Sequence, residues 1–216
     1  IEMACTDLIC RRLNIPVYTY LGGEQVRKLR FNAWIGILPP AEAAAEAKKW
    51  FDKGFRSAKV KVGGGISADR DRIAAIREAV GPTMSLRADA NAGYSVDDGI
   101  ALAKLLEPFS LQLLEQPVAA DDLSGMAKVR QSTSIPIMAD ESIIDFESLI
   151  SVIKHDAADI VKLKVMKQGG FLNTRRMLET ATAAGMRVVI GHGFGLGINT
   201  AAEIMLAATS TNVLEG

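Results

Sequence analysis

The chain has 216 residues, and its 25 lysines and arginines balance 25 aspartates and glutamates, so the formal net charge is zero. This balance gives no indication of nucleic acid or an anionic membrane as a partner. Apolar residues come in short runs broken by charge, and no run approaches the ~20 residues of a membrane helix. Cys5 and Cys10 lie five residues apart in a helix-like segment. We expect them to be thiols rather than a disulfide, which fits a cytoplasmic protein.

Residues 1–13 have the spacing of a helix, and Pro16 and Gly22-Gly23 break the chain after it. From residue 31 onward, strand-like and helix-like runs alternate. The expected strands are 31–35, 57–62, 84–89, 111–115, 135–139, 160–164, 187–190 and a start near residue 212. The expected helices are 41–53, 68–80, 96–106, 123–131, 146–154, 172–184 and 199–209. This strict alternation predicts parallel strands joined by crossover helices.

Five ionisable residues end successive strand-like runs at intervals of 28, 26, 25 and 24 residues, namely Lys61, Asp89, Glu115, Asp140 and Lys164. An open doubly wound sheet places its site at one switch point, served by two or three strands. A barrel brings the ends of many strands to one mouth. The five charged strand ends therefore favour a TIM-like α/β barrel. Such a barrel usually takes ~250 residues, so we expect a (β/α)7β barrel that is incomplete at its C-terminal end.

Two of the expected strands carry a Lys-x-Lys pattern, Lys59-Val60-Lys61 and Lys162-Leu163-Lys164. Because side chains alternate along a strand, both lysines of a pair point to one face. Mutual repulsion and partial burial would lower their pKa values towards those of a general base. A solvated lysine pair on an exposed edge is an equally good interpretation of either pattern alone. In an eight-stranded barrel, strands two and six lie roughly opposite each other.

Acidic residues follow the third, fourth and fifth strands, in Asp89-Ala90-Asn91, Glu115-Gln116-Pro117 and Asp140-Glu141-Ser142. Three carboxylates from adjacent strands suit Mg²⁺ and do not suit a structural zinc site. A single acid at a strand end is more often a helix N-cap, but three acids in matched positions favour a metal site. Spacing alone does not choose between Asp140 and Glu141.

Together with Lys164-Val165-Met166-Lys167-Gln168-Gly169-Gly170, these motifs resemble the barrel domain of the enolase superfamily. The most similar branch is the muconate-lactonizing-enzyme subgroup of the mandelate racemase/muconate lactonizing enzyme family. The resemblance covers the chain from residue 1, with 1–30 as a helix and turn leading into a barrel at 31–216. It also implies that the α+β capping domain of this family is lacking here.

The resemblance implies a Mg²⁺ ion held by Asp89, Glu115 and Asp140, with Lys61 and Lys164 as an opposed acid–base pair. It further implies that Lys59 tunes Lys61 and touches the substrate carboxylate, and that Asn91 contacts the substrate or supports its neighbours. Lys162 departs from the family, where a neutral residue is common, and could add a substrate contact. His192, in the glycine-rich stretch Gly191–Gly197, is expected to contact the substrate or to fill its loop, with a direct catalytic role as the less favoured alternative.

The predicted activity is Mg²⁺-dependent abstraction of a proton α to a carboxylate, through a metal-stabilised enediolate. The outcome would be racemisation, epimerisation or cycloisomerisation of a small carboxylate, by what we expect to be a homo-oligomer that binds neither nucleic acid nor membranes. An acid-sugar dehydratase of the mandelate racemase type is the first alternative. A lysine barrel that forms a Schiff base, or a binding barrel without catalysis, is the second.

Overall fold

The computed structural model describes residues 1–193 and 195–215, which fall into two compact units. The first unit contains Ile1–Arg30, Ile143–Ile153 and Ile160–Glu215. The second contains Phe31–Ser142 and Lys154–Asp159.

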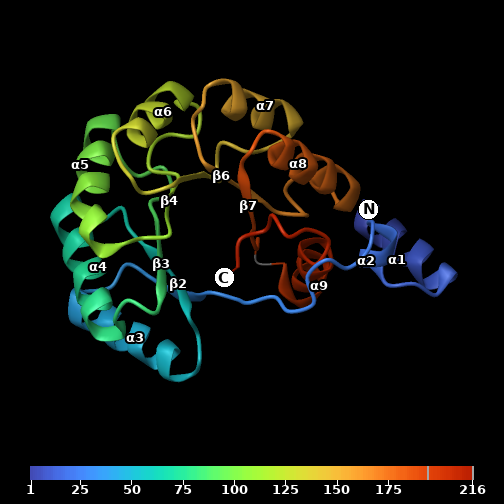
Figure 1. Cartoon of the computed structure of the whole chain (residues 1–216), viewed down its shortest axis with the longest axis horizontal. Helices are drawn as coiled ribbons and strands as arrows, with labels where there is room; N and C mark the ends of the chain where they lie inside the picture. The colour runs from blue at the N-terminus through green and yellow to red at the C-terminus, as the bar shows by residue number, and fades with distance from the viewer. Residues whose placement is uncertain (194, 216) are drawn as a thin grey trace. The chain divides into compact units, whose positions relative to one another are not determined.

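The second unit is built on five parallel strands that are hydrogen-bonded in chain order, and this confirms the predicted parallel arrangement. The strands are β1 (Ala33–Ile35), β2 (Ser57–Lys61), β3 (Ser85–Asp89), β4 (Leu113–Glu115) and β5 (Ile137–Ala139). The helices are α3 (Pro40–Asp52), α4 (Ile66–Val80), α5 (Val96–Leu106), η1 (Glu107–Phe109) and α6 (Leu123–Gln131). Helices α3 to α6 lie on one side of this sheet (Figure 1).

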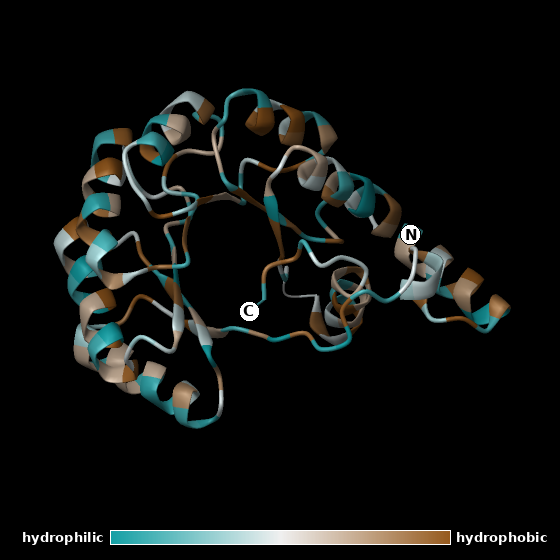
Figure 2. Ribbon diagram, in the orientation of Figure 1, coloured by the Kyte–Doolittle hydropathy of each residue, from teal (hydrophilic) through white to brown (hydrophobic). Residues whose placement is uncertain are grey.

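Apolar side chains fill the space between these strands and helices. Val60 on β2 is fully buried, as are Ile73 and Ile76 on α4 and Leu102 on α5. The helices carry hydrophobic and hydrophilic residues side by side along their length (Figure 2), as expected for helices that bury one face. The lysines of β2 alternate with the buried residues and therefore point to the face of the sheet opposite the helices.

The first unit contains two parallel strands, with Leu163 of β6 paired to Ile190 of β7. Its elements are α1 (Glu2–Leu13), α2 (Val17–Tyr20), α7 (Phe146–Lys154), β6 (Ile160–Leu163), α8 (Phe171–Ala183), β7 (Arg187–Ile190) and α9 (Leu196–Ala207). The strand start expected near residue 212 is a single parallel bridge between Val213 and Val188. The unit's core includes Leu21, Phe171 and Leu206.

The observed strands β1, β4 and β5 are shorter at their starts than the alternation of residues predicts, and α2 was not expected. Pro16 precedes α2 with extended backbone, and the amide of Leu21 closes the single turn on the carbonyl of Val17 at 3.0 Å. The glycines at 22 and 23 then adopt positive φ, which ends the helix.

Helix α1 is fixed to α8 through the carboxylate of Glu2. Its two oxygens accept hydrogen bonds from the amides of Phe171, at 2.7 Å, and Leu172, at 3.2 Å. These are first-turn amides of α8, which have no partner inside their own helix. Gly170, the N-cap, has a φ of 124° and no side chain, which leaves room for the Glu2 side chain. A residue of α1 thus supplies the cap that α8 lacks in its own sequence.

We predict that Glu2→Ala lowers the free energy of unfolding by about 1 kcal/mol, the usual value of a helix cap. Urea denaturation followed by circular dichroism would measure the change. Asp7→Ala is the matched control, because Asp7 lies on the same helix in an exposed ion pair with Arg11 and such pairs contribute little. Equal stability of the Glu2 variant and the wild type would contradict the capping role.

Candidate functional site

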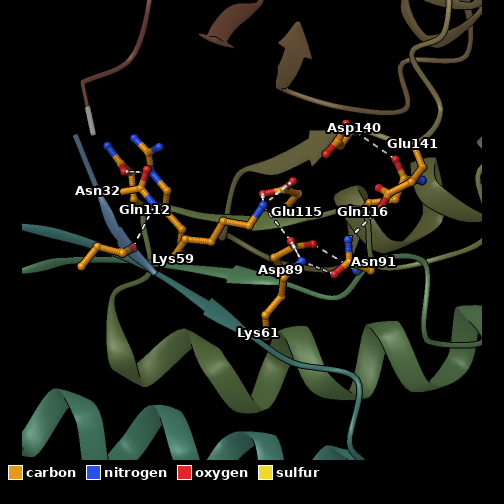
Figure 3. Close-up of polar contacts among 12 residues, drawn as sticks. Asn32, Lys59, Lys61, Asp89, Asn91, Gln112, Glu115, Gln116, Asp140 and Glu141 are labelled. Carbon is orange, nitrogen blue, oxygen red and sulfur yellow. Dashed lines mark hydrogen bonds and ion pairs between the residues drawn. The ribbon is translucent and has the colours of Figure 1, made fainter. Parts of the chain in front are cut away.

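Four charged side chains meet at the carboxyl ends of β2, β3 and β4 (Figure 3). The ammonium of Lys59 lies 2.7 Å from Oδ2 of Asp89 and 3.0 Å from Oε1 of Glu115. The ammonium of Lys61 lies 2.5 Å from the same Oδ2 of Asp89. The strand register explains the meeting, because Lys61 pairs with Asp89 and Asp89 pairs with Glu115 along the parallel ladder.

The two carboxylates are almost completely buried, whereas the two lysine side chains keep 16% and 23% of their exposure. Burial alone would raise the pKa of Asp89, but the ammonium groups of Lys59 and Lys61 outweigh it and hold that pKa below its usual value. Burial also lowers the pKa of the neighbouring Arg87 to about 10, although the charge of Glu115 opposes this shift. The two ammonium groups therefore keep the Asp89 carboxylate ionised despite its burial.

Asn91 connects this cluster to the loop after β5. Its backbone amide donates to Oδ1 of Asp89 at 3.0 Å, and its side-chain oxygen accepts a hydrogen bond from the ammonium of Lys61. Its side-chain nitrogen donates to Oε1 of Glu141 at 2.8 Å. Asn91 makes these contacts with a φ of 43°, a left-handed conformation that asparagine tolerates better than most residues.

Asp140 is buried at the end of β5, and its loop is held by Gln116. The side-chain oxygen of Gln116 accepts hydrogen bonds from the amides of Asp140, at 3.0 Å, and Ser142, at 3.2 Å. Its side-chain nitrogen donates to the hydroxyl of Ser142 at 2.9 Å. Gln116 is fully buried, and sequence reasoning assigned it no role of its own. The available signal was a polar residue directly after the charged end of a strand.

Other residues act as helix caps after these strands. Ser95 caps α5, Asp122 caps α6, and Asp145 accepts from the amide of Ser148 in the first turn of α7. The N-cap interpretation of Asp89, Glu115 and Asp140 is therefore wrong.

The donor atoms fit a hard divalent cation. Asp89 and Glu115 both approach one positive charge, that of Lys59, and hard carboxylate oxygens are what Mg²⁺ prefers. Oε2 of Glu141 is buried without a hydrogen-bond partner among the described residues. Within residues 1–193 and 195–215, however, no three acidic, histidine or cysteine side chains form a ready-made metal cluster. In this structure the carboxylates of Asp89 and Glu115 are therefore bridged by the ammonium group of Lys59.

Lys162, Lys164 and His192 belong to the first unit. Lys162 is buried in β6, and its methylene groups lie so close to Gly191 that any side chain there would collide with them. Lys164 follows β6, and its amide donates to the side-chain oxygen of Gln168 at 2.6 Å. Gln168 in turn donates to the carbonyl of Ile143 at 3.0 Å. The backbone that carries Lys164 is therefore fixed.

His192 is paired with a carboxylate that the sequence did not indicate. Its Nδ1 lies 2.7 Å from Oε2 of Glu203, and the side-chain nitrogen of Asn199 donates to Oε1 of Glu203 at 2.7 Å. Burial raises the pKa of Glu203, although His192, Asn199 and Lys164 act in the opposite direction. Asn199 and Glu203 lie one turn apart on α9, and residues with this spacing are often ordinary core residues. Phe194, in the same glycine-rich loop, lies outside the described residues.

The structure thus brings together Lys59, Lys61, Asp89, Asn91 and Glu115 by direct contact, and it fixes the Asp140 loop through Gln116. Residues 42–216 match the family described as Enolase C-terminal domain-like. The chain belongs to this family. The chain is 37% identical over 210 residues to the D-Ala-D/L-Ala epimerase of Cytophaga hutchinsonii. It is 35% identical over 216 residues to the hydrophobic dipeptide epimerase of Enterococcus faecalis.

These matches cover 96% and 99% of this chain but 57% and 60% of the two relatives, so the chain spans about three-fifths of their length. Among solved structures, the Cytophaga hutchinsonii dipeptide epimerase complexed with Mg and D-Ala-L-Val gives a TM-score of 0.95 at 34% identity, over 99% of this chain and 58% of the other. The N-succinyl Arg/Lys racemase of Bacillus cereus gives 0.96 at 31%, over 99% and 58%.

This agreement confirms the predicted fold class, a TIM-like barrel of parallel strands and alternating helices. The relatives include epimerases, a racemase, and the D-galactarolactone cycloisomerase of Agrobacterium fabrum at 33% identity. In the described part of the chain, no helix combines the length and the apolar character needed to cross a membrane.

We predict that the Asp89→Asn variant, compared in chelator with the wild type, is less stable at neutral pH, because two ammonium groups lose their shared partner. A carboxyl group with a lowered folded-state pKa stabilises the fold above its unfolded pKa of ~3.9, and that contribution disappears as pH falls through the folded-state value. The difference in unfolding free energy should therefore be constant above about pH 5 and shrink below pH 4. Urea titrations between pH 3 and 7 measure it, and a difference independent of pH would contradict the ion pairing.

Proposed function

We propose that this chain carries the catalytic frame of a Mg²⁺-dependent isomerase that removes the proton α to the carboxylate of a small substrate on one face and delivers a proton to the opposite face, which inverts the configuration of that carbon. Racemisation or epimerisation is the favoured outcome, with cycloisomerisation next. The single observation that supports it most is the cluster of Lys59, Lys61, Asp89 and Glu115 at three successive strand ends, in a chain of the enolase family.

In this proposal, Asp89, Glu115 and Asp140 hold the Mg²⁺ ion. When bound, the ion would stabilise the negative charge that develops on the substrate carboxylate as the α-proton leaves. Lys59 supports this role, because its ammonium already lies between Asp89 and Glu115. Such a group can turn from these carboxylates to a substrate carboxylate while remaining in a negatively charged environment.

Lys61 and Lys164 act as the acid–base pair, each serving one face of the α-carbon. Lys61 is suited to this work because its ammonium is partly exposed and oriented by Asn91. Lys164 is suited because Gln168 fixes its backbone directly after β6. A lysine in its amine form removes the proton, and an ammonium group on the other face returns one. Lys162 and His192 contribute substrate contacts.

The substrate class that we propose is a dipeptide or an N-acylated amino acid. The supporting relatives are the dipeptide epimerases and the racemase named above, one of them solved with Mg and a dipeptide. Such substrates combine a free carboxylate with an α-proton next to it. We further propose that the protein works in solution as a homo-oligomer, which light scattering after size-exclusion chromatography measures.

The pairing of His192 with Glu203 favours a second candidate, dehydration of an acid sugar. A histidine whose Nδ1 is held by a carboxylate has a defined ring orientation, which leaves Nε2 as the nitrogen available to a substrate. Such a group can protonate a departing hydroxyl during β-elimination. Formation of a 2-keto product from an acid sugar, absent in the His192→Asn variant, would establish this activity.

We predict that D-Ala-L-Val, L-Leu-L-Tyr or N-succinyl-L-Arg, incubated with the protein and Mg²⁺ in D₂O, loses the NMR signal of the α-proton next to its free carboxylate. Lys61→Ala and Lys164→Ala should each slow epimerisation by about 10²–10⁴-fold, the usual range for a general acid or base. Each variant should also stop exchange from a different epimer, because each lysine serves one face. Lys128→Ala, at an exposed lysine on α6, is the control. Near-normal turnover in both test variants would refute the mechanism.

We predict that Asp89→Asn, Glu115→Gln and Asp140→Asn each abolish Mg²⁺ binding in isothermal titration calorimetry, because each removes one charged oxygen donor. Lys61→Ala should bind Mg²⁺ with wild-type affinity or better, because it removes a competing positive charge. Undiminished binding in all three carboxylate variants would exclude the proposed ligand set. A substrate adduct trapped by borohydride, without any effect of a chelator, would instead favour the Schiff-base alternative.

A further inference from the structure

A buried ion pair on α4 lies beneath the loop that follows Lys61. Asp69 is fully buried and Arg72 nearly so, and a guanidinium nitrogen of Arg72 donates to Oδ1 of Asp69. Tyr94, from the loop after β3, donates its hydroxyl to Oδ2 of Asp69. We call Asp69, Arg72 and Tyr94 the α4 cluster. Its members contribute neither to the proposed metal site nor to the proposed acid–base pair.

The α4 cluster binds the main chain directly after Lys61. Oδ2 of Asp69 accepts hydrogen bonds from the amides of Gly63, at 2.7 Å, and Gly64, at 3.0 Å. Arg72 donates to the carbonyl of Lys61 itself at 3.4 Å, and to the carbonyl of Leu38 in the loop after β1 at 2.6 Å. Three successive peptide units after the end of β2 thus have a partner in this cluster or on β3, since the amide of Val62 donates to the carbonyl of Asp89.

Tyr94 extends the same network to the loop that carries Asn91. Its hydroxyl accepts from the amide of Gly63 at 3.1 Å while it donates to Asp69. Burial and the Asp69 carboxylate raise the pKa of the Tyr94 phenol above its usual value, so the hydroxyl remains protonated as this arrangement requires. The loops close tightly here, because a side chain at Gly93 would collide with the carbonyl oxygen of Ala90.

A buried ion pair is a poor source of net stability, because the cost of removing both charges from water offsets their attraction. This ion pair instead fixes the position of the main chain after Lys61. The ammonium of Lys61 ends a flexible stem and contacts Asp89 and Asn91, which belong to the end of β3 and its loop. The position of that ammonium therefore depends on how the loops after β2 and β3 are held against each other.

We propose that Asp69, assisted by Arg72 and Tyr94, is a positioning residue for Lys61. This inference rests on the proposed function for its kinetic consequence, and on the contacts above for its structural one. A misplacement of about 1 Å can cost on the order of 10²-fold in rate. Loss of the Asp69 carboxylate should therefore lower kcat much more than it changes KM.

The test uses three variants of the protein. Asp69→Asn keeps the volume but removes the charge that two amides, a phenol and a guanidinium share. Tyr94→Phe removes one hydroxyl and is the milder change. Arg77→Met is the matched control: Arg77 lies on the same helix and donates to the carbonyls of Gly81, at 2.8 Å, Met84, at 2.7 Å, and Phe109, at 3.0 Å. Its loss destabilises α4 without touching the loop after Lys61.

The first measurement needs no substrate. Competitive labelling of lysine amines with acetic anhydride, resolved by mass spectrometry, reports how firmly each ammonium is held. Lys61 should react faster in Asp69→Asn than in the wild type and to an intermediate extent in Tyr94→Phe, whereas Arg77→Met should leave its reactivity unchanged. Amide exchange at residues 62–65 should increase in the same order. Unchanged labelling and exchange in both test variants would overturn the proposal.

The second measurement is α-proton exchange of D-Ala-L-Val and its epimer in D₂O. Asp69→Asn should lose, by on the order of 10²-fold, exchange from the same epimer that Lys61→Ala stops exchanging, and should retain exchange from the other. An equal loss from both epimers, matched by Arg77→Met, would show a purely structural role and overturn the proposal. If the wild type exchanges neither epimer although Lys61 labelling responds to Asp69→Asn, the proposed activity fails and the positioning of Lys61 stands.

Discussion

Two carboxylates placed side by side inside a protein repel each other and lose their hydration, so they require a cation between or beside them. In this chain the register of three parallel strands creates that situation, because Asp89 and Glu115 are paired directly across β3 and β4. The ammonium of Lys59 satisfies both. Much of the surrounding polar structure follows from this requirement, including the contacts of Lys61 and Asn91 with Asp89.

The loops around these charges are held by uncharged or self-compensated groups rather than by further ions. Gln116 fixes the loop that carries Asp140 through its side-chain amide. The α4 cluster fixes the loop after Lys61 through one carboxylate whose charge its own arginine balances. Neither of these two supports adds net charge beside the strand ends.

The sequence was sufficient to predict the parallel alternation and the charged residues at or directly after the strand ends, but it did not predict the ion pairs that Lys59 and Lys61 form with the carboxylates. Those features depend on periods of about 25 residues and on the two-residue period of a strand, both of which can be counted. The partners Gln116, Asp69 and Glu203 were not predictable in this way. Each contacts a loop atom through a geometry that only the folded backbone defines, and its position fits an ordinary buried residue equally well.

The late starts of β1, β4 and β5 were not predicted from the sequence either. The choice between Asp140 and Glu141 was also beyond the sequence. In the structure the two differ in partners, because Glu141 bonds to Asn91 whereas the backbone of Asp140 is bound by Gln116. The three matched carboxylates already favoured a divalent metal, whereas the family resemblance provided the individual ligands and the proposed reaction.

The cap that Glu2 provides for α8 has a consequence for biosynthesis. The hydrogen-bonded residues Glu2 and Phe171 lie 169 positions apart in the chain. At 5–20 residues per second, a ribosome needs roughly 10–30 s between making the first and the second. During that interval Glu2 lacks the α8 amides that it caps, and an isolated helix of the length of α1 is marginal in water. Completion of this unit must therefore wait until most of the chain has left the ribosome, however early its first residues emerge.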